Sequence, residues 1–269
     1  MRYVFVLGAP RTGTTMLGAL LGTHRDVMCP GEYFGFYVAR SIVPNAIRRI
    51  PSALRDAYIA DVREHAEAFA ERAAKAAGAT AFCDATPWNL LIADELTAAL
   101  SGALFVLCVR RPEGVVQSLA RSFAHGFRWA GANVQSRARL YADFYTQVTH
   151  LPEERTVAFD YDRFCVQPHQ QIGAFLHQLS NRLDTEPAAF DERVLAEAHA
   201  PAVGSNPPIA AASSDGRLVY RPRPSYDASA LTVEDRAVIA RVALPGLTAL
   251  RSRFPDTIAA STLTDHGVS

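Results

Sequence analysis

Lysine is almost absent from this sequence. Lys75 is the only lysine among the 27 basic residues, and it lies in an alanine-rich stretch remote from any glycine-rich loop. Kinases and ATPases use a lysine in their phosphate-binding loop to contact the terminal phosphates of the nucleotide. Without such a lysine, any anion that this chain binds must be met by arginine, backbone N–H groups and hydroxyl groups.

Other features are also missing. The 27 basic residues are balanced by 27 acidic ones, so the charge gives no reason to expect a nucleic acid or a membrane as a partner. The four cysteines have neither metal-ligand nor redox spacing, and the histidines are scattered, so we expect no metal. The chain has no recognisable signal peptide and no run of about 18 apolar residues. We therefore expect a cytoplasmic protein.

Apolar runs that alternate with amphipathic stretches predict the fold. Strands are expected at 3–8, 81–83, 104–109 and 156–159. Helices are expected at 34–50, 52–77, 87–100 with Thr86 as cap, 133–150 and 232–253, and from Pro112. This order is typical of an α/β fold, here a P-loop-type three-layer α/β/α architecture with a central parallel sheet and a single domain over 1–269. Ligands of such folds bind at the carboxyl ends of the strands.

The first motif is the loop Gly8–Thr15, between an apolar strand and an apolar helix. It has the spacing of a nucleoside-triphosphate loop, but Thr14 stands where the lysine should be. We expect the backbone N–H groups of Thr12, Gly13, Thr14 and Thr15 and the helix N-terminus to bind a phosphate.

The second motif follows the strand at 104–109. Arg110 ends this buried strand, and Ser118 lies about two turns into the next helix, so both can face the crevice at the strand ends. A planar guanidinium and a hydroxyl suit a phosphate. Alone, the pair could equally be a surface arginine and a helix serine. Together with the lysine-free loop, it indicates a nucleotide with two separate phosphate groups.

Both motifs resemble those of sulfotransferases that use 3′-phosphoadenosine 5′-phosphosulfate (PAPS). The family's segment that wraps the 5′-phosphosulfate matches 10–15, and its arginine followed eight residues later by serine, which binds the 3′-phosphate, matches Arg110 and Ser118. The resemblance implies PAPS as the cofactor and needs no metal. It implies that Arg11 contacts the phosphosulfate and stabilises the charge on the leaving group.

The resemblance also suggests a general base. Glu32 follows the first helix and a turn, where related enzymes carry a catalytic glutamate. It could instead be a glutamate favoured by the dipole at a helix N-terminus. His125 and Asp84 are weaker candidates for the base. We expect Glu32 and Arg11 to be the catalytic residues.

The proline-rich loop 200–230 resembles that of tyrosylprotein sulfotransferases, in which it closes over the cofactor. The similar segments are 213–215 and 219–222, and they make Ser214 and Arg221 expected cofactor-binding residues. A generic surface loop is the alternative. Two features depart from the family pattern: Ala85 replaces a lysine common in the family, and Tyr33-Phe34 after Glu32 resembles bacterial carbohydrate sulfotransferases.

The function expected from these motifs is transfer of sulfonate from PAPS to a tyrosine of a peptide or protein. The alternatives are the same chemistry on a carbohydrate or small-molecule hydroxyl, a P-loop nucleotide kinase, and a nucleotide-binding module without catalysis. The acceptor peptide could be acidic, and a homodimer is possible. The arginines that could favour an acidic peptide, or could be solvated helix faces, are Arg40, Arg48, Arg49 and Arg128.

Overall fold

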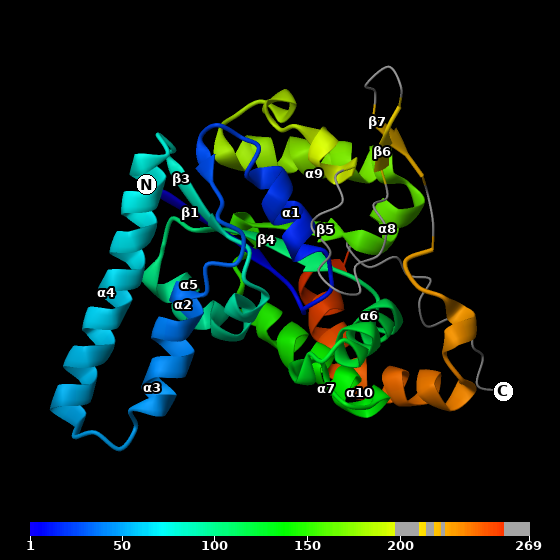
Figure 1. Cartoon of the computed structure of the whole chain (residues 1–269), viewed down its shortest axis with the longest axis horizontal. Helices are drawn as coiled ribbons and strands as arrows, with labels where there is room; N and C mark the ends of the chain where they lie inside the picture. The colour runs from blue at the N-terminus through cyan, green and yellow to red at the C-terminus, as the bar shows by residue number, and fades with distance from the viewer. Residues whose placement is uncertain (197–209, 214–217, 222–223, 256–269) are drawn as a thin grey trace.

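Figure 1 presents a computed structural model of the chain, which describes residues 1–196, 210–213, 218–221 and 224–255. Its strands are β1 (Arg2–Leu7), β2 (Val27–Met28), β3 (Ala81–Asp84), β4 (Leu104–Val109), β5 (Thr156–Asp160), β6 (Ala210–Ala212) and β7 (Leu218–Tyr220). Its α-helices are α1 (Thr14–Leu21), α2 (Gly35–Tyr37), α3 (Val43–Ala46), α4 (Ser52–Ala76), α5 (Ala93–Ala99), α6 (Pro112–Ala124), α7 (Val134–Tyr145), α8 (Tyr161–Val166), α9 (Pro168–Leu183) and α10 (Val233–Arg253).

Five parallel strands form the central sheet in the order β2-β3-β1-β4-β5. This confirms the predicted α/β fold. β1 lies in the middle, paired with β3 on one side and β4 on the other. Because all strands run the same way, the loops that follow β1, β3 and β4 emerge at one edge. The two sequence motifs and Glu32 belong to segments that meet at this edge.

Alternate residues of the strands face two apolar layers. One layer packs against α1, α8 and α9, and the other against α4, α5, α6, α7 and α10. Figure 1 shows this division, with α1 and α9 above the sheet and α7 and α10 below it. β4 is buried along its whole length, as a central parallel strand requires. The helices thus hold the strand ends in place from both sides.

The boundaries differ from the predicted ones in several places. The helix predicted at 34–50 is split into α2, a π-helix η1 (Val38–Ile42) and α3, and the one predicted at 87–100 begins as the 3₁₀-helix η2 (Pro87–Ile92). Thr86 was expected to cap this helix, but its hydroxyl donates to Asp84 Oδ1 instead (2.6 Å). A short α7 and the 3₁₀-helix η4 (Thr146–His150) replace the helix predicted at 133–150. β2, β6 and β7 were not predicted because strands of two or three residues leave no periodicity.

None of the helices in the described ranges has both the length and the apolar character that crossing a membrane demands. Groups of three or more His, Cys, Asp or Glu that could hold a metal ion are likewise absent from these ranges.

Helix α10 packs very closely on α7 through Gly246. A methyl group at Gly246 would lie 3.0 Å from Ala142 Cα and 3.1 Å from Tyr145 Cβ. These are backbone-proximal atoms that cannot rotate away. Glycine is therefore required here for the approach of the two helices, despite its poor helix propensity.

We expect Gly246→Ala to lower the free energy of unfolding by about 1–3 kcal/mol, because overpacking outweighs the better helix propensity of alanine. Gly173 is the matched control: it lies in α9, and a Cβ there would meet nothing within 4 Å. Gly173→Ala should raise the free energy of unfolding by about 0.5–1 kcal/mol. Urea unfolding of both variants measures the difference, and equal effects would contradict the packing argument.

Candidate active site

The loop after β1 is tightly folded against the end of β4. A Cβ at Gly8 would lie 2.6 Å from Thr12 Oγ1 and 2.8 Å from the carbonyl oxygen of Cys108. The hydroxyl of Thr12 donates to the carbonyl of Ala9 (2.8 Å) and closes the turn. Gly13 has a φ of 107°, which an L side chain rarely adopts. Glycine at positions 8 and 13 is therefore a steric requirement of this loop.

The loop leads directly into the N-terminus of α1. The first helical hydrogen bond runs from Leu17 N to Gly13 O (3.0 Å), so the N–H groups of Thr14, Thr15 and Met16 have no acceptor within the helix. Among the described residues, no side chain caps this end. Free amides and the positive end of the helix dipole favour a bound anion. The side chain of Thr14, in the lysine position, is buried, whereas Thr15 is exposed.

Arg11, Arg110 and Ser118 come together at this loop, as the two motifs predict. Arg11 Nε donates to Ser118 Oγ (3.1 Å) across 107 residues of sequence. Arg110 Nη1 donates to the carbonyl of Arg11 (2.9 Å). Arg11 has a φ of 77°, which is unfavourable for any residue with a side chain. The hydrogen bond from Arg110 holds this strained backbone in place.

Arg110 is buried, with its guanidinium 4.6 Å from the centre of the Tyr161 ring. Its Nη2 donates to the carbonyl of Ser225, while its Nε has no hydrogen-bond partner among the described residues. Gly114, where a Cβ would lie 2.7 Å from this Nε, leaves room for the guanidinium beside α6. A buried guanidinium N–H without an acceptor is a donor available to an anion.

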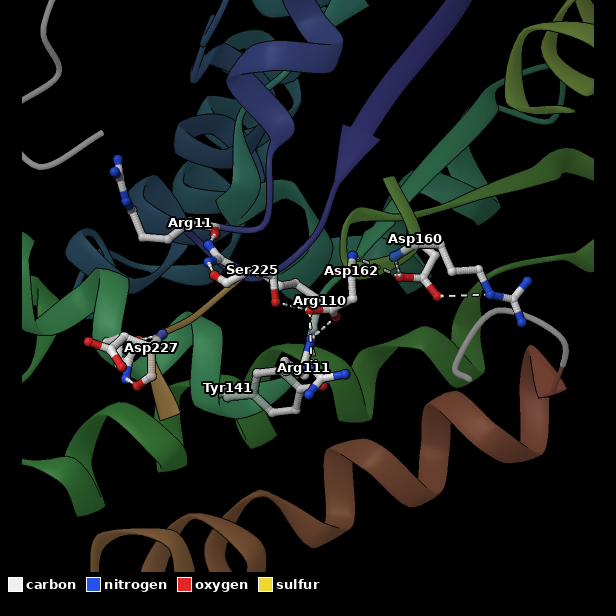
Figure 2. A network of polar contacts seen from close by, with 10 residues as sticks. Arg11, Arg110, Arg111, Tyr141, Asp160, Asp162, Ser225 and Asp227 are labelled. Atoms are coloured by element: carbon white, nitrogen blue, oxygen red, sulfur yellow. Dashed lines mark hydrogen bonds and ion pairs between the residues drawn. The ribbon is translucent and has the colours of Figure 1, made fainter. Parts of the chain in front are cut away.

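Figure 2 shows a polar network around Arg110 that the sequence motifs do not reveal. Asp162 accepts from Arg111 N (2.6 Å), from Arg111 Nε (3.1 Å) and from the hydroxyl of Ser225. Gln117 Nε2 donates to the carbonyl of Asp227, and its Oε1 accepts from the N–H of the same residue (3.0 Å). These bonds dock residues 225–227 onto the N-terminal half of α6. The one sequence signal for this network is that residues 160–162 lie at the end of the strand predicted at 156–159, and it indicates only the part that involves Asp162.

Several positive charges gather at the loop. The pKa of Arg11 is lowered by burial and by repulsion from Arg110 and Arg121, and only partly restored by Tyr161 and Glu32. The carboxylate of Asp162 is held by Arg111 and Ser225. The α1 amides and the Nε of Arg110, which has no partner among the described residues, fit a ligand with anionic groups at two places, as a nucleotide with separate phosphates would have.

Glu32 lies in a loop that is fastened to the end of β3. Ala85 N donates to Gly31 O (2.9 Å), Tyr33 N to Asp84 Oδ1 (3.1 Å), and Phe34 N to Thr86 Oγ1 (3.0 Å). These bonds bracket Glu32, whose own side chain is exposed. Glu32 thus lies beside the carboxyl end of β3, and its catalytic role stays a prediction.

The pKa of Glu32 is raised by partial burial and by the nearby Asp84, and lowered to a smaller extent by Arg11. The influence of Arg11 on this pKa means that Glu32 lies within electrostatic reach of the loop arginine. Asp84, by contrast, is fully buried and accepts from Thr86 N (2.9 Å), Thr86 Oγ1 (2.6 Å) and Asn89 Nδ2 (2.8 Å) in addition to Tyr33 N. Asp84 is thus an anchor for the loop. Burial raises the pKa of Asp84 as well, but its oxygens already accept four hydrogen bonds, so the exposed carboxylate of Glu32 is the one accessible to an acceptor hydroxyl.

The other predicted residues lie elsewhere or outside the described ranges. His125 lies at the C-terminal end of α6 and is exposed. Arg40 is buried in an ion pair with Glu67 (2.5 Å), so Arg40 is neither part of a solvated helix face nor available to a peptide. Arg48, Arg49 and Arg128 are exposed.

Ser214, an expected cofactor-binding residue, lies outside the described residues. Arg221 is exposed and follows Tyr220, which donates to Glu192 (2.5 Å), and its cofactor role stays a prediction.

Residues 3–184 match the sulfotransferase family. A sulfotransferase domain from the curacin biosynthetic pathway has a similar structure, with a TM-score of 0.51, 16% identity, and coverage of 89% of this chain and 96% of that domain. The sulfotransferase domain of the Synechococcus PCC 7002 olefin synthase (TM-score 0.49, 14% identity, 90% and 94% covered) and a sulfotransferase from Alicyclobacillus acidocaldarius (0.49, 13%, 93% and 94%) also match. No curated protein matches the sequence. The likeness to the domain from the curacin pathway bears on the fold alone.

The pKa of Asp160, at the end of β5, is a property of this region that can be tested. It accepts from the N–H groups of Asp162 (2.9 Å) and Arg163 (3.0 Å) at the start of α8, and burial raises its pKa from 3.8 to about 6. The folded protein therefore binds a proton more tightly than the unfolded chain does. The contribution of Asp160 to stability is greatest below pH 4 and falls as the pH rises to about 6.

We expect Asp160→Asn, which keeps an acceptor for the helix cap, to remove this dependence. Relative to wild type, the variant should become more stable by about 2–3 kcal/mol between pH 4 and pH 7. Urea unfolding at the two pH values measures the change. A constant difference between variant and wild type would mean that Asp160 is ionised throughout.

Proposed function

Because the chain belongs to the sulfotransferase family, which its residues 3–184 match, we propose that it moves sulfonate from PAPS to the hydroxyl of a tyrosine in a peptide or protein. The chain is a sulfotransferase; the cofactor, the acceptor and the residue roles are the proposal. The single observation that carries it is the meeting of Arg11, Ser118 and Arg110 at the N-terminus of α1, close to a glutamate of raised pKa.

A nucleoside-triphosphate mechanism fits this site poorly. Thr14 occupies the lysine position, its side chain is buried, and Lys75 lies on α4. The loop therefore lacks the cation that contacts the terminal phosphates in P-loop kinases. It retains the amides that suit a single phosphate at the helix N-terminus.

PAPS, when bound, supplies a sulfonate that is transferred roughly in line to the acceptor oxygen. The N–H groups of residues 12–15 bind its 5′-phosphate, and Arg11 stabilises the charge that develops on the leaving oxygen. Ser118 holds the Nε of Arg11 and, with Arg110, binds the 3′-phosphate. In this type of reaction the protein mainly positions groups and stabilises charge.

Segment 225–227 bears on how Arg110 binds a phosphate. Its Nη2 already donates to the carbonyl of Ser225 and its Nη1 to the carbonyl of Arg11, which leaves Nε without a partner among the described residues. Arg110 can bind a phosphate through Nε with the segment in place, or through its full fork after the segment moves. Either way, segment 225–227, which is part of the proline-rich loop 200–230, is coupled to the proposed cofactor site.

Glu32 is the proposed general base. An acceptor hydroxyl must lose its proton as it attacks, and a carboxylate of raised pKa accepts that proton more readily than an ordinary one. The hydrogen bonds at Gly31, Tyr33 and Phe34 fix the loop that carries it.

A group of aromatic side chains that includes two exposed ones supports an aromatic acceptor. Trp88 lies two residues after Thr86. The hydroxyl oxygen of Thr86 accepts a hydrogen bond from Phe34 N in the Glu32 loop. The ring of Trp88 lies 5.3 Å from that of Trp129, which is 44% exposed. Phe127, 6.1 Å from Trp129, is 42% exposed. Such rings offer edge-to-face contacts to a tyrosine side chain.

A carbohydrate hydroxyl is the second candidate acceptor, because Tyr33 and Phe34 follow Glu32 as in bacterial carbohydrate sulfotransferases. Transfer of labelled sulfonate from PAPS to tyrosine peptides, glycans and small phenols distinguishes the acceptors. Transfer to tyrosine peptides is the expected result, and transfer only to glycans would replace the tyrosine proposal by this second one. Thermal stabilisation by adenosine 3′,5′-bisphosphate, but not by ATP, tests the nucleotide specificity separately.

We expect Arg11→Ala to lower kcat by about 10²–10³-fold, the effect of removing one preorganised donor from an oxyanion site. Arg139→Ala is the control, since Arg139 is exposed on α7 and pairs with Asp143 (3.0 Å) away from the loop. Steady-state kinetics with saturating PAPS measure both. An Arg11→Ala enzyme with wild-type kcat would exclude Arg11 from charge stabilisation.

We expect Glu32→Gln to lower kcat by about 10²–10⁴-fold. Because the pKa of Glu32 is raised above 4.5, the wild-type rate should fall on the acid side at a higher pH than an ordinary glutamate would give. The variant should lose this acid limb from its pH–rate profile. Glu64→Gln, an exposed position on α4, is the matched control. If the acid limb persists in Glu32→Gln, another group is the base.

A further inference from the structure

Two cysteines that are remote in the sequence lie side by side at the edge of the sheet. β2 pairs with β3 in the register Val27↔Ala81 and Met28↔Phe82, so the next pair is Cys29 opposite Cys83. Both side chains belong to the apolar layer on the α1 face. Neighbouring strands are about 4.8 Å apart, which lies within the Cα separation that a disulfide requires. Each thiol shifts the pKa of the other, as neighbouring side chains do.

The two thiols differ in a way that suits sequential reaction. Cys29 is half-buried, and the pKa of its thiol is lowered by hydrogen bonds from Cys83 and from the backbone of Gly31. Cys83 is fully buried, and its contact with Cys29 together with burial raises the pKa of its thiol. An accessible thiol of low pKa attacks first, and a buried neighbour then resolves the product.

Cys29 is also connected to the proposed base. The backbone of Gly31, the residue before Glu32, is one of the groups that lower the pKa of the Cys29 thiol. Cys83 directly precedes Asp84, which holds the N–H of Tyr33 on the other side of Glu32 (3.1 Å). The thiol pair is therefore adjacent to Gly31 and to Asp84, the groups that attach the Glu32 loop on either side of Glu32.

We propose that Cys29 and Cys83 form a reversible oxidation site, which a low-molecular-weight disulfide converts to an intramolecular disulfide and which thereby alters the Glu32 loop. The Cys29 thiolate attacks one sulfur of the oxidant, forms a mixed disulfide and releases one small thiol. The Cys83 thiol loses its proton to water, and its sulfur attacks Cys29, releasing the second small thiol. Two protein thiols are oxidised and one small disulfide is reduced, so electrons and atoms balance.

The consequence for activity rests on the proposed role of Glu32. A disulfide sulfur is a weaker hydrogen-bond acceptor than a thiolate, so the contact with Gly31 weakens on oxidation. Loss of one such hydrogen bond corresponds to about two- to tenfold in an equilibrium or rate. We expect the oxidised enzyme to turn over more slowly by this factor and to recover fully with a reducing agent.

The test treats the full-length protein with oxidised glutathione and maps its cysteines by mass spectrometry. The expected product has lost two hydrogen atoms and yields a linked peptide pair containing Cys29 and Cys83. Cys83→Ala should stop at a glutathione adduct on Cys29, and Cys29→Ala should leave Cys83 unmodified. Cys165→Ala, in α8, is the matched control and should react as wild type does. A persistent adduct on wild-type Cys29, or no reaction there, would overturn the proposal.

The wild-type peptide map needs no variant, so a poorly folded cysteine variant does not obscure the result. It also needs no turnover, so it separates this proposal from the proposed function. A linked pair in a protein without transferase activity would contradict only the function. A linked pair with unchanged turnover would overturn the coupling to the Glu32 loop.

Discussion

The site depends on the hydrogen bond from Arg110 to the carbonyl of Arg11. Arg11 has a backbone conformation that costs roughly 1–2 kcal/mol for a residue with a side chain. The bond comes from a buried guanidinium that is itself packed on Tyr161 and fixed by the end of β4. The strained turn aims the α1 amides and the side chain of Arg11 at one place. One arginine thus shapes the loop while the other supplies its charge.

The close approach of α1 to β3 explains the departure at Ala85. A Cβ at Gly18 would lie 2.6 Å from the Cβ of Ala85, and Ala85 is completely buried. The side chain at this position is directed at the helix, and a lysine there would have to displace it. The cations at the loop are instead Arg11 and Arg110. The absence of lysine and the tight packing of α1 are therefore mutually consistent.

The sequence predicted what depends on local pattern. The spacing of the first loop, the apolar run of β4 and the separation of Arg110 from Ser118 each lie within one strand–helix unit. The structure confirms the strand at β4 and brings Arg110 and Ser118 to the first loop, whereas their phosphate-binding roles stay a prediction. The bond from Arg110 to Ser225 and the contact between Cys29 and Cys83 were not foreseen. Both depend on the strand order β2-β3-β1-β4-β5, which brings together segments with no shared motif. Thr86 was misassigned for a similar reason, because the competing acceptor Asp84 is buried beside it only in the folded chain.

Asp84 links the stability of the site to its chemistry. Its carboxylate is buried, and four hydrogen bonds offset only part of the loss of solvent, so its pKa is still raised. Two of its donors, Tyr33 N and Thr86 Oγ1, hold the Glu32 loop directly or through Phe34. The same negative charge raises the pKa of Glu32, whereas Arg11 lowers it. An amide at position 84 could preserve some of the hydrogen bonds, but it could not raise that pKa. A carboxylate is therefore needed here for electrostatic reasons as well as for the fold.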